Sequence, residues 1–183
     1  MRPGARWRSP RAGFAAALLL ALVAAGTQGV LATRDATPPM TSTAGVGETA
    51  VLGGTSVVVD SLTTAAALPA AEAGAPDVTG PAGSVLVLVV FTQRVDAGVD
   101  LERHFCTSTL VADDGSVWDT DDELGYRLRR PKASTCGDDP SDPLRSGEPR
   151  QIGASFLIPA RYADQVRWRL SLDDDRARLE VRP

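Results

Sequence analysis

Two kinds of hydrophobic pattern divide the chain. One continuous apolar run lies near the N-terminus, from Phe14 to Ala25, and softens into small residues that end at Ala32. From residue 48 onward, apolar residues form short runs or alternate with polar residues, and turn-forming residues separate these groups. Alternation over four to eight positions is typical of strands, whereas an amphipathic helix repeats every 3.6 residues. The pattern therefore predicts one apolar N-terminal segment followed by a domain of strands.

The pattern within the domain predicts about eight short strands. The strongest covers Ser84 to Phe91, where a continuous β-branched and apolar run predicts burial on both faces. Two others, Arg150 to Ile158 and Val166 to Leu172, alternate and present one apolar face to the core. The remaining predicted strands are residues 48–52, 55–62, 105–112, 116–118 and 177–181. With Gly53-Gly54 and Asp113-Asp114-Gly115 as hairpin turns, they predict an all-β antiparallel sandwich or barrel.

Three segments lack this periodicity. Residues 63–83 are rich in Ala, Gly and Pro and predict a long surface loop, with a helical turn over 65–73 as the alternative. Residues 119–149 are polar and predict a second long loop. Residues 33–45 are rich in Thr, Ser and Pro, which is typical of a flexible linker. The sequence thus predicts a linker over 33–45 and a sandwich domain over 46–183.

The N-terminal segment, residues 1–32, predicts export. Its charged start contains Arg2, Arg6, Arg8 and Arg11. A charged start, an apolar stretch and a small-residue site are the three parts of a secretory signal peptide, which would be cleaved after Ala32. Alternatively, Phe14 to Ala32 is an apolar helix of about 19 residues, enough to anchor the chain in a bilayer with the arginines inside. Both alternatives place the domain outside the cytoplasm, either membrane-anchored or secreted.

Charge narrows the set of partners. The chain has 19 basic and 23 acidic residues, and residues 1–32 contain four of the basic ones and none of the acidic ones. The rest therefore has 15 basic and 23 acidic residues, a net charge of −8. The phosphate backbone of a nucleic acid repels an acidic domain, so we do not expect a nucleic acid as a partner. We expect an envelope or extracellular protein, together with the membrane if the N-terminal segment stays uncleaved.

The chain has two cysteines, Cys106 and Cys136, both in the exported part. An even number of cysteines in an oxidising compartment predicts a disulfide. It would close a loop of about 30 residues and contribute about 3–4 kcal/mol in the chain-entropy model. A redox pair is the alternative, although the two cysteines lack the Cys-x-x-Cys spacing.

The order of several short patterns resembles a family of bacterial exported domains of unknown function with an immunoglobulin-like (telokin-like) β-sandwich. The patterns are Val46-Gly47-Glu48, Gly53-Gly54, Val85 to Phe91, Asp113 to Trp118, Ser146-Gly147-Glu148 and Phe156 to Pro159. They cover roughly residues 46–172. The resemblance implies the fold and an extracytoplasmic location, and it offers no catalytic residues. This chain departs from the family in its cysteine pair and in residues 65–83 and 119–142, where we expect its individual function to lie.

The acidic loop contains one candidate site. Asp119, Asp121 and Glu123 alternate, and calcium takes six to eight oxygen ligands, often from carboxylates at alternating positions. An EF-hand needs Gly at its sixth position and Glu at its twelfth, where this chain has Leu124 and Arg130. The loop's other acidic residues are Asp122, Asp138, Asp139 and Asp142. We interpret the loop as a solvated acidic segment, with calcium binding as the alternative.

A basic stretch follows the first acidic residues. It consists of Tyr126, Arg127, Arg129, Arg130 and Lys132. Opposite charges this close in sequence predict ion pairs within the loop. Binding of an anionic ligand, such as a cell-wall polymer, is the alternative.

The other polar and aromatic candidates have structural interpretations. His104 and Cys106 would supply two metal ligands, whereas a closed zinc site needs four, and no nucleophile pattern accompanies this histidine. Asp173-Asp174-Asp175 is typical of a turn between strands. Trp168 lies on an apolar strand face, so we expect it in the core, while Trp118 at a strand end fits either the core or a binding surface.

These observations predict a non-catalytic extracytoplasmic β-sandwich that acts as a binding or envelope-interaction module through the loops at one end, chiefly residues 119–149. The alternative is a calcium-, carbohydrate- or lipid-binding module that uses the acidic loop 119–142. The sequence contains no catalytic constellation and no cofactor motif, so we do not expect an enzyme.

Overall fold

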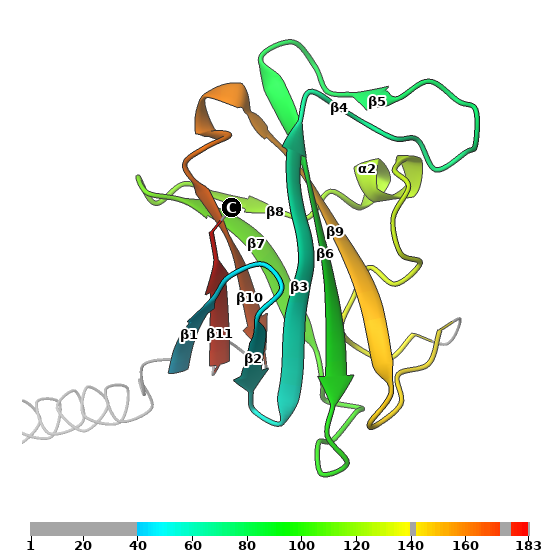
Figure 1. The fold of residues 1–183 in the computed structure, drawn as a ribbon, viewed down its shortest axis with the longest axis vertical. Helices are drawn as coiled ribbons and strands as arrows, with labels where there is room; N and C mark the ends of the chain where they lie inside the picture. Colours follow the sequence, from blue (N-terminus) through cyan, green and yellow to red (C-terminus); the bar gives the residue numbers. More distant parts are fainter. Residues whose placement is uncertain (1–39, 140–141, 173–176, 183) are drawn as a thin grey trace, which may run out of the picture. The chain divides into compact units, whose positions relative to one another are not determined.

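The computed structural model describes residues 40–139, 142–172 and 177–182 (Figure 1). The chain divides into a unit Met1–Pro38 and a unit Pro39–Pro183 that contains the strands. The predicted signal or anchor segment, residues 1–32, lies outside the described residues, as does the predicted Asp173-Asp174-Asp175 turn. Within the described ranges, no helix is long and apolar enough to cross a membrane.

Two sheets enclose the main core. The five-stranded sheet has the order β1 (Met40–Ala44), β11 (Ala177–Val181), β10 (Val166–Leu172), β7 (Cys106–Ala112) and β8 (Val117–Asp119). The four-stranded sheet has the order β2 (Thr49–Leu52), β3 (Thr55–Ala65), β6 (Ser84–Val95) and β9 (Pro149–Pro159). Phe91 of one sheet and Trp168 of the other meet across the core, with ring centroids 4.9 Å apart. The described part of the chain is thus a β-sandwich, as predicted.

The alternating patterns correctly identified the inner faces. Ile152, Ala154, Phe156 and Ile158 of β9 are all buried, and so are Val166, Trp168, Leu170 and Leu172 of β10. Trp168 is a core residue as predicted, and its indole N–H donates a 2.6 Å hydrogen bond to the Ser108 hydroxyl. The buried nitrogen therefore keeps a partner, which offsets the cost of removing it from water.

Part of the predicted linker 33–45 is a strand, and residues 33–39 lie outside the described residues. Met40–Ala44 forms β1, which pairs in parallel with the last strand, β11. All the other strand pairs in the two large sheets are antiparallel among the described residues. The purely antiparallel prediction was therefore wrong at this edge, because the partner strand lies at the opposite end of the chain and leaves no local signal.

The Ala/Pro-rich segment 63–83 is not a plain loop, and it contains no helical turn. β3 continues to Ala65, and β4 (Ala67–Leu68) then pairs with β5 (Val78–Thr79) as a short antiparallel ribbon. The ribbon helps to form a second small core on the outer face of the four-stranded sheet. The buried members of this core are Leu68, Val78, Leu86, Leu124 and Leu128. This core covers Leu86 and part of Leu88 on the outer face of β6, and the main core covers the other face. The predicted two-sided burial is therefore confirmed for this part of the strand, while Val90 is half-buried.

The Gly53-Gly54 turn joins β2 to β3 as predicted, with Leu52 and Thr55 as the closing pair. Gly53 and Gly54 have φ values of 54° and 83°, the left-handed conformation that a two-residue hairpin turn requires. A Cβ atom on Gly54 would also lie 2.8 Å from a methyl carbon of Val99. The second glycine is therefore required both by the backbone and by the space around it.

Candidate functional site

Residues 121–133 of the long polar segment 119–149 run along the edge of β9, whereas the sequence analysis expected this segment among the loops at one end of the sandwich (Figure 1). The Asp121 N–H donates to the Ser155 carbonyl at 2.8 Å, and the Ser155 hydroxyl donates back to the Asp121 carbonyl at 2.9 Å. Farther along, the Gly153 N–H donates to the Ala133 carbonyl at 3.0 Å. A bare edge strand would expose such backbone groups to other chains. The segment therefore protects β9, and its outward surface is fixed to the sheet.

Within this segment, residues 122–127 form a short helix, α2 (Asp122–Arg127), that the sequence analysis missed. The Asp121 side chain accepts a 2.8 Å hydrogen bond from the Leu124 N–H, which caps the first turn. Asp122 and Glu123 lie in the first turn and Arg127 in the last, an arrangement that the helix dipole favours. The cap and the charge order were visible in the sequence, but six residues are too few for a helical period.

Arg130 holds this part of the segment in place. Its Nε donates to the Gly125 carbonyl at 2.8 Å. Its Nη1 donates to three more carbonyls, those of Pro131 at 3.1 Å, Ala133 at 3.3 Å and Gly153 at 3.4 Å. One guanidinium thus joins α2, the following turn and β9. The sequence grouped Arg130 with the possible ligand-binding cations, but its donors are directed at the protein's own backbone.

The second half of the segment is fixed by an arginine from the sheet and by the predicted disulfide. Arg150 of β9 donates to the Gly137 carbonyl at 2.8 Å and pairs with Asp142 at 3.1 Å. Cys106 and Cys136 are joined, with Cα atoms 5.5 Å apart. This confirms the disulfide, which connects the segment to the start of β7.

The three calcium candidates do not converge. Asp121 and Glu123 line one depression of about 220 Å³, and Asp119 lines a different one of about 240 Å³ beside the disulfide. One oxygen of Asp121 is already used in the helix cap. In the described ranges, no group of three or more His, Cys, Asp or Glu side chains is arranged to hold a metal ion. The geometry therefore gives the calcium alternative no support.

The depression beside the disulfide has five Ser and Thr residues and two Asp residues in its lining. Its polar lining residues are Thr107, Ser108, Asp119, Thr120, Asp122, Ser134 and Thr135. Phe91 and Cys106 complete it. Hydroxyls and carboxylates together can donate to and accept from a polyhydroxyl ligand. The sequence did not single out this set, because its members come from three separate segments.

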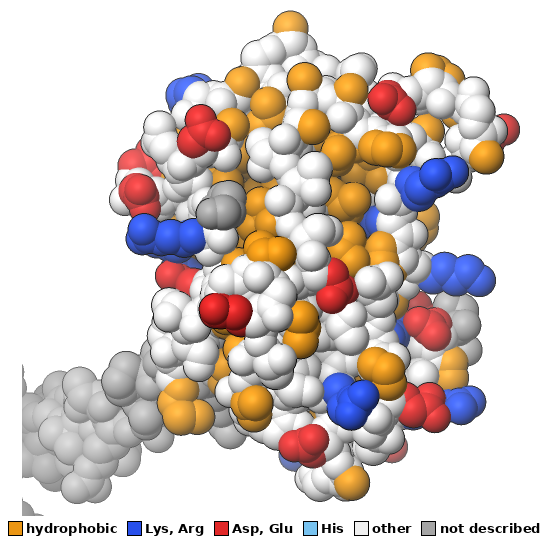
Figure 2. All heavy atoms as spheres, in the orientation of Figure 1, with side chains coloured by type: hydrophobic (Ala, Val, Ile, Leu, Met, Phe, Trp, Pro, Cys, Tyr) orange, Lys and Arg blue, Asp and Glu red, His pale blue; other side chains and the backbone are white. Residues whose placement is uncertain are grey.

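The basic stretch presents an exposed surface. Tyr126 is 79% exposed, and Arg127, Arg129 and Lys132 are also exposed. Of the ion pairs found in the described part of the chain, none involves these three cations, so the predicted pairs within the loop are not seen. Figure 2 shows Lys and Arg side chains projecting on the side where Figure 1 places α2 and the chain that follows it.

The backbone of this stretch is held by the other insertion. The Ala71 N–H donates to the Arg127 carbonyl at 2.8 Å, and the Arg129 N–H donates to the Pro69 carbonyl at 2.9 Å. Leu128 between them is buried. We call residues 122–132, held by residues 69–71 and by β9, the α2 platform. The two long segments without strand periodicity, residues 63–83 and 119–149, therefore meet at one surface.

The remaining aromatic and histidine candidates are structural in this arrangement. His104 is only 3% exposed. Trp118 packs against Tyr162, with ring centroids 4.8 Å apart. Tyr162 also donates a 2.8 Å hydrogen bond to Asp114. The backbone N–H of Ser116, the Ser116 hydroxyl and the Tyr162 hydroxyl together lower the pKa of Asp114 below its ordinary value of 3.8. These contacts stabilise the β7–β8 hairpin turn.

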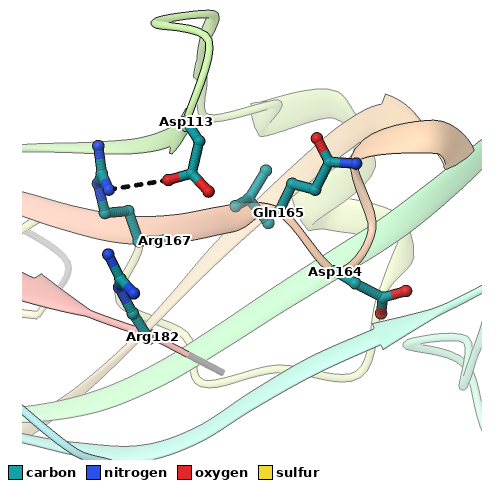
Figure 3. A pocket seen from close by; sticks show the side chains of 6 residues that line it. Asp113, Asp164, Gln165, Arg167 and Arg182 are labelled. Carbon is teal, nitrogen blue, oxygen red and sulfur yellow. Dashed lines mark hydrogen bonds and ion pairs between the residues drawn. The ribbon is translucent and has the colours of Figure 1, made fainter.

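A further depression of about 250 Å³ lies beside the start of β10 (Figure 3). Arg167 on its wall pairs with Asp113 at 3.1 Å and with Glu180 at 3.3 Å, so its charge is balanced from both sides. Asp164, Gln165 and Arg182 also line it. This arrangement fits an internal ion-pair network better than a site for a charged ligand.

Three solved structures are similar to the described fold. An uncharacterised β-sandwich protein from Clostridium difficile 630 is 9% identical, with a TM-score of 0.48 over 79% of this chain and 95% of that protein. A conserved hypothetical protein from Bacillus anthracis is 11% identical, with a TM-score of 0.49 over 74% and 93%. The yjhA protein from Bacillus subtilis is 14% identical, with a TM-score of 0.49 over 75% and 97%. No family model and no curated protein matches the chain. The β-sandwich assignment follows from the two sheets described above.

Proposed function

We propose that the protein is a non-catalytic, extracytoplasmic binding domain that contacts an envelope or extracellular component through the outer face of the α2 platform. The Arg-flanked apolar segment supports export, and the Cys106–Cys136 disulfide fits an oxidising compartment. The immunoglobulin-like class and the choice between a secreted and a membrane-anchored form belong to the same proposal.

The proposal rests on one property of the α2 platform: its backbone is held in place, while its outward side chains make no hydrogen bond or ion pair among the described residues. Arg130, the α2 cap and the hydrogen bonds to residues 69–71 hold the platform. Tyr126, Arg127, Arg129 and Lys132 project from it, and none takes part in a side-chain hydrogen bond or ion pair within the described ranges. A preorganised surface loses less conformational entropy on binding than a mobile one does. Exposed Tyr and Arg are also the residue types enriched at protein interfaces.

Co-sedimentation with washed envelopes of the cells that make the protein tests this proposal. The assay contains an uncharged detergent, which keeps the apolar N-terminal segment in micelles. We expect the purified full-length protein to pellet with the detergent-washed envelopes and Y126A/R129Q to stay mostly in the supernatant. The matched control is V51A/R94Q, which removes one exposed apolar side chain and one exposed charge on the four-stranded sheet. Equal pelleting of all three proteins would contradict the assignment of the surface.

The hydroxyl-lined depression favours a second candidate function, the binding of a neutral carbohydrate. Its hydroxyls and its two carboxylates, Asp119 and Asp122, match the donors and acceptors of a sugar. Isothermal titration with neutral oligosaccharides tests it. Binding that is abolished by D119N and unchanged by R129Q would favour the depression over the platform.

A further inference from the structure

The geometry points to an anionic glycan as the ligand of the α2 platform: a polymer of sugars or polyols that carries phosphate or carboxylate groups along its length. This inference rests on the proposed function, because it names the ligand class of the same surface. Three features of the platform support it.

The first feature is charge. Most of the exported domain is acidic, yet Arg127, Arg129 and Lys132 place three exposed cations within six residues, without an ion pair in the described part of the chain. Several arginines outside the platform, among them Arg145 and Arg169, pair with a carboxylate instead. A local excess of positive charge on an acidic domain attracts anions to that surface in particular.

The second feature is spacing. The chain leaves α2 in an extended conformation, with φ of −93° and ψ of 147° at Leu128. At about 3.3 Å per residue, Arg127 and Lys132 lie at most about 17 Å apart along the backbone, with Arg129 between them. Cations that belong to different residues along a stretch of chain can each meet a different charge of a polymer that repeats its charges.

The third feature is the ring of Tyr126, which is 79% exposed next to the first cation. Tyrosine combines a flat apolar face with a polar hydroxyl and therefore suits a partner that is apolar on one side and wet on the other. A sugar ring has this character, whereas an acidic peptide or a lipid headgroup offers mainly charge. The tyrosine thus favours a glycan over other polyanions.

The acidic start of α2 limits where such a ligand can bind. Asp122 and Glu123 are exposed in the first turn and repel anions there. A helix rises 1.5 Å per residue, so these acids lie only about 6–8 Å from Arg127 along the helix axis. The favourable strip therefore runs away from the helix start, along residues 126–132.

The test measures binding of the full-length protein, held in uncharged detergent, to defined polymers. The probes are polygalacturonate, which has a carboxylate on each sugar, and a glycerol phosphate polymer. Dextran is the neutral control and polyglutamate is the acidic peptide control. Glycerophosphoglycerol, the soluble headgroup of phosphatidylglycerol, is the anionic lipid control, because the apolar N-terminal segment would itself insert in vesicles. We expect binding to the first two probes, weakened by salt, and at least tenfold weaker binding to the three controls.

Two variants with the same change in charge locate the site. We expect R127Q/R129Q/K132Q to lower the affinity for both anionic polymers at least tenfold and to reduce its dependence on salt. The control R94Q/R103Q/R145Q removes three exposed positive charges elsewhere, and we expect a change below twofold.

A separate variant tests the contribution of the ring. We expect Y126A to lower the affinity for polygalacturonate several-fold and to leave the residual binding of polyglutamate unchanged. Equal losses on both probes would contradict a glycan-specific contact.

The outcomes separate the ligand class from the proposed function. Equal binding to polyglutamate or to glycerophosphoglycerol overturns the glycan assignment, and so does equal loss in both triple variants. Pelleting with envelopes without binding to either anionic polymer overturns this inference and leaves the proposed function standing. The absence of both interactions overturns the two together.

Discussion

Replacing Arg130 by Ala removes the main link between the α2 platform and the sheet. The guanidinium donates to four carbonyls, two at 2.8 and 3.1 Å and two at the longer distances of 3.3 and 3.4 Å. A hydrogen bond to a charged group contributes about 1.5–3 kcal/mol, and bonds that share one group do not add fully. We therefore expect the free energy of unfolding to fall by about 2–4 kcal/mol. This is a large part of the ~5–15 kcal/mol that stabilises a typical domain.

Unfolding in guanidinium chloride with the disulfide intact, followed by tryptophan fluorescence, measures this loss of stability. The matched control is Arg129→Ala, one residue away, where an exposed side chain makes no ion pair in the described structure. Its cost should stay below about 0.5 kcal/mol. Hydrogen exchange gives a local measurement, because the Gly153 N–H donates to the Ala133 carbonyl and should exchange faster in R130A. Equal unfolding free energies for the two variants, with unchanged exchange at Gly153, would refute this account of the platform.

Three further predictions follow from the fold. Replacing both cysteines by Ser should lower the free energy of unfolding by about 3–4 kcal/mol, measured by denaturant titration, and leave the far-ultraviolet spectrum of the folded protein unchanged. A pH titration followed by NMR of the carboxyl carbon should place the pKa of Asp114 below 3.8, and Y162F should raise that pKa. Because the pKa of Asp114 is lowered in the folded state, its contribution to stability is present above pH 3.8. That contribution is lost as the pH falls through the lower pKa of the folded state. Gly54→Ala should cost more than Gly47→Ala in thermal melts, because both have φ above +80° but a Cβ on Gly47 meets nothing within 4 Å, whereas one on Gly54 meets Val99.

Much of the sandwich could be predicted because its signals are local. Alternation along β9 and β10 identified both inner faces, and the two glycines at 53–54 identified the β2–β3 turn. The uninterrupted apolar run of β6 indicated burial on both faces, which the second small core explains. Each of these signals depends on residues that are close neighbours in the chain.

The parts that were missed depend on distant partners. β1 has a weak pattern of its own and forms a strand because β11, at the far end of the chain, pairs with it. The β4–β5 ribbon has two residues in each strand and is held by burial of Leu68 and Val78 on another sheet. Strands this short carry no readable period.

The candidate site shows the same limit. The sequence identified the basic stretch and the cysteine pair, but it could not separate Arg130 from its neighbours. The four carbonyls that Arg130 contacts come together only when α2, the turn after it and β9 are folded. The calcium candidates show the converse, because Asp119 and Glu123 are close in sequence but line different depressions.

The most direct test of the central claim, an exported and disulfide-bonded binding domain, is the intact mass of the native protein in each cell fraction. The account predicts a protein outside the cytoplasm, two hydrogens lighter than its reduced form, either starting at Thr33 in the soluble fraction or full-length in the membrane fraction. A full-length protein in the cytoplasm with both thiols free would contradict it.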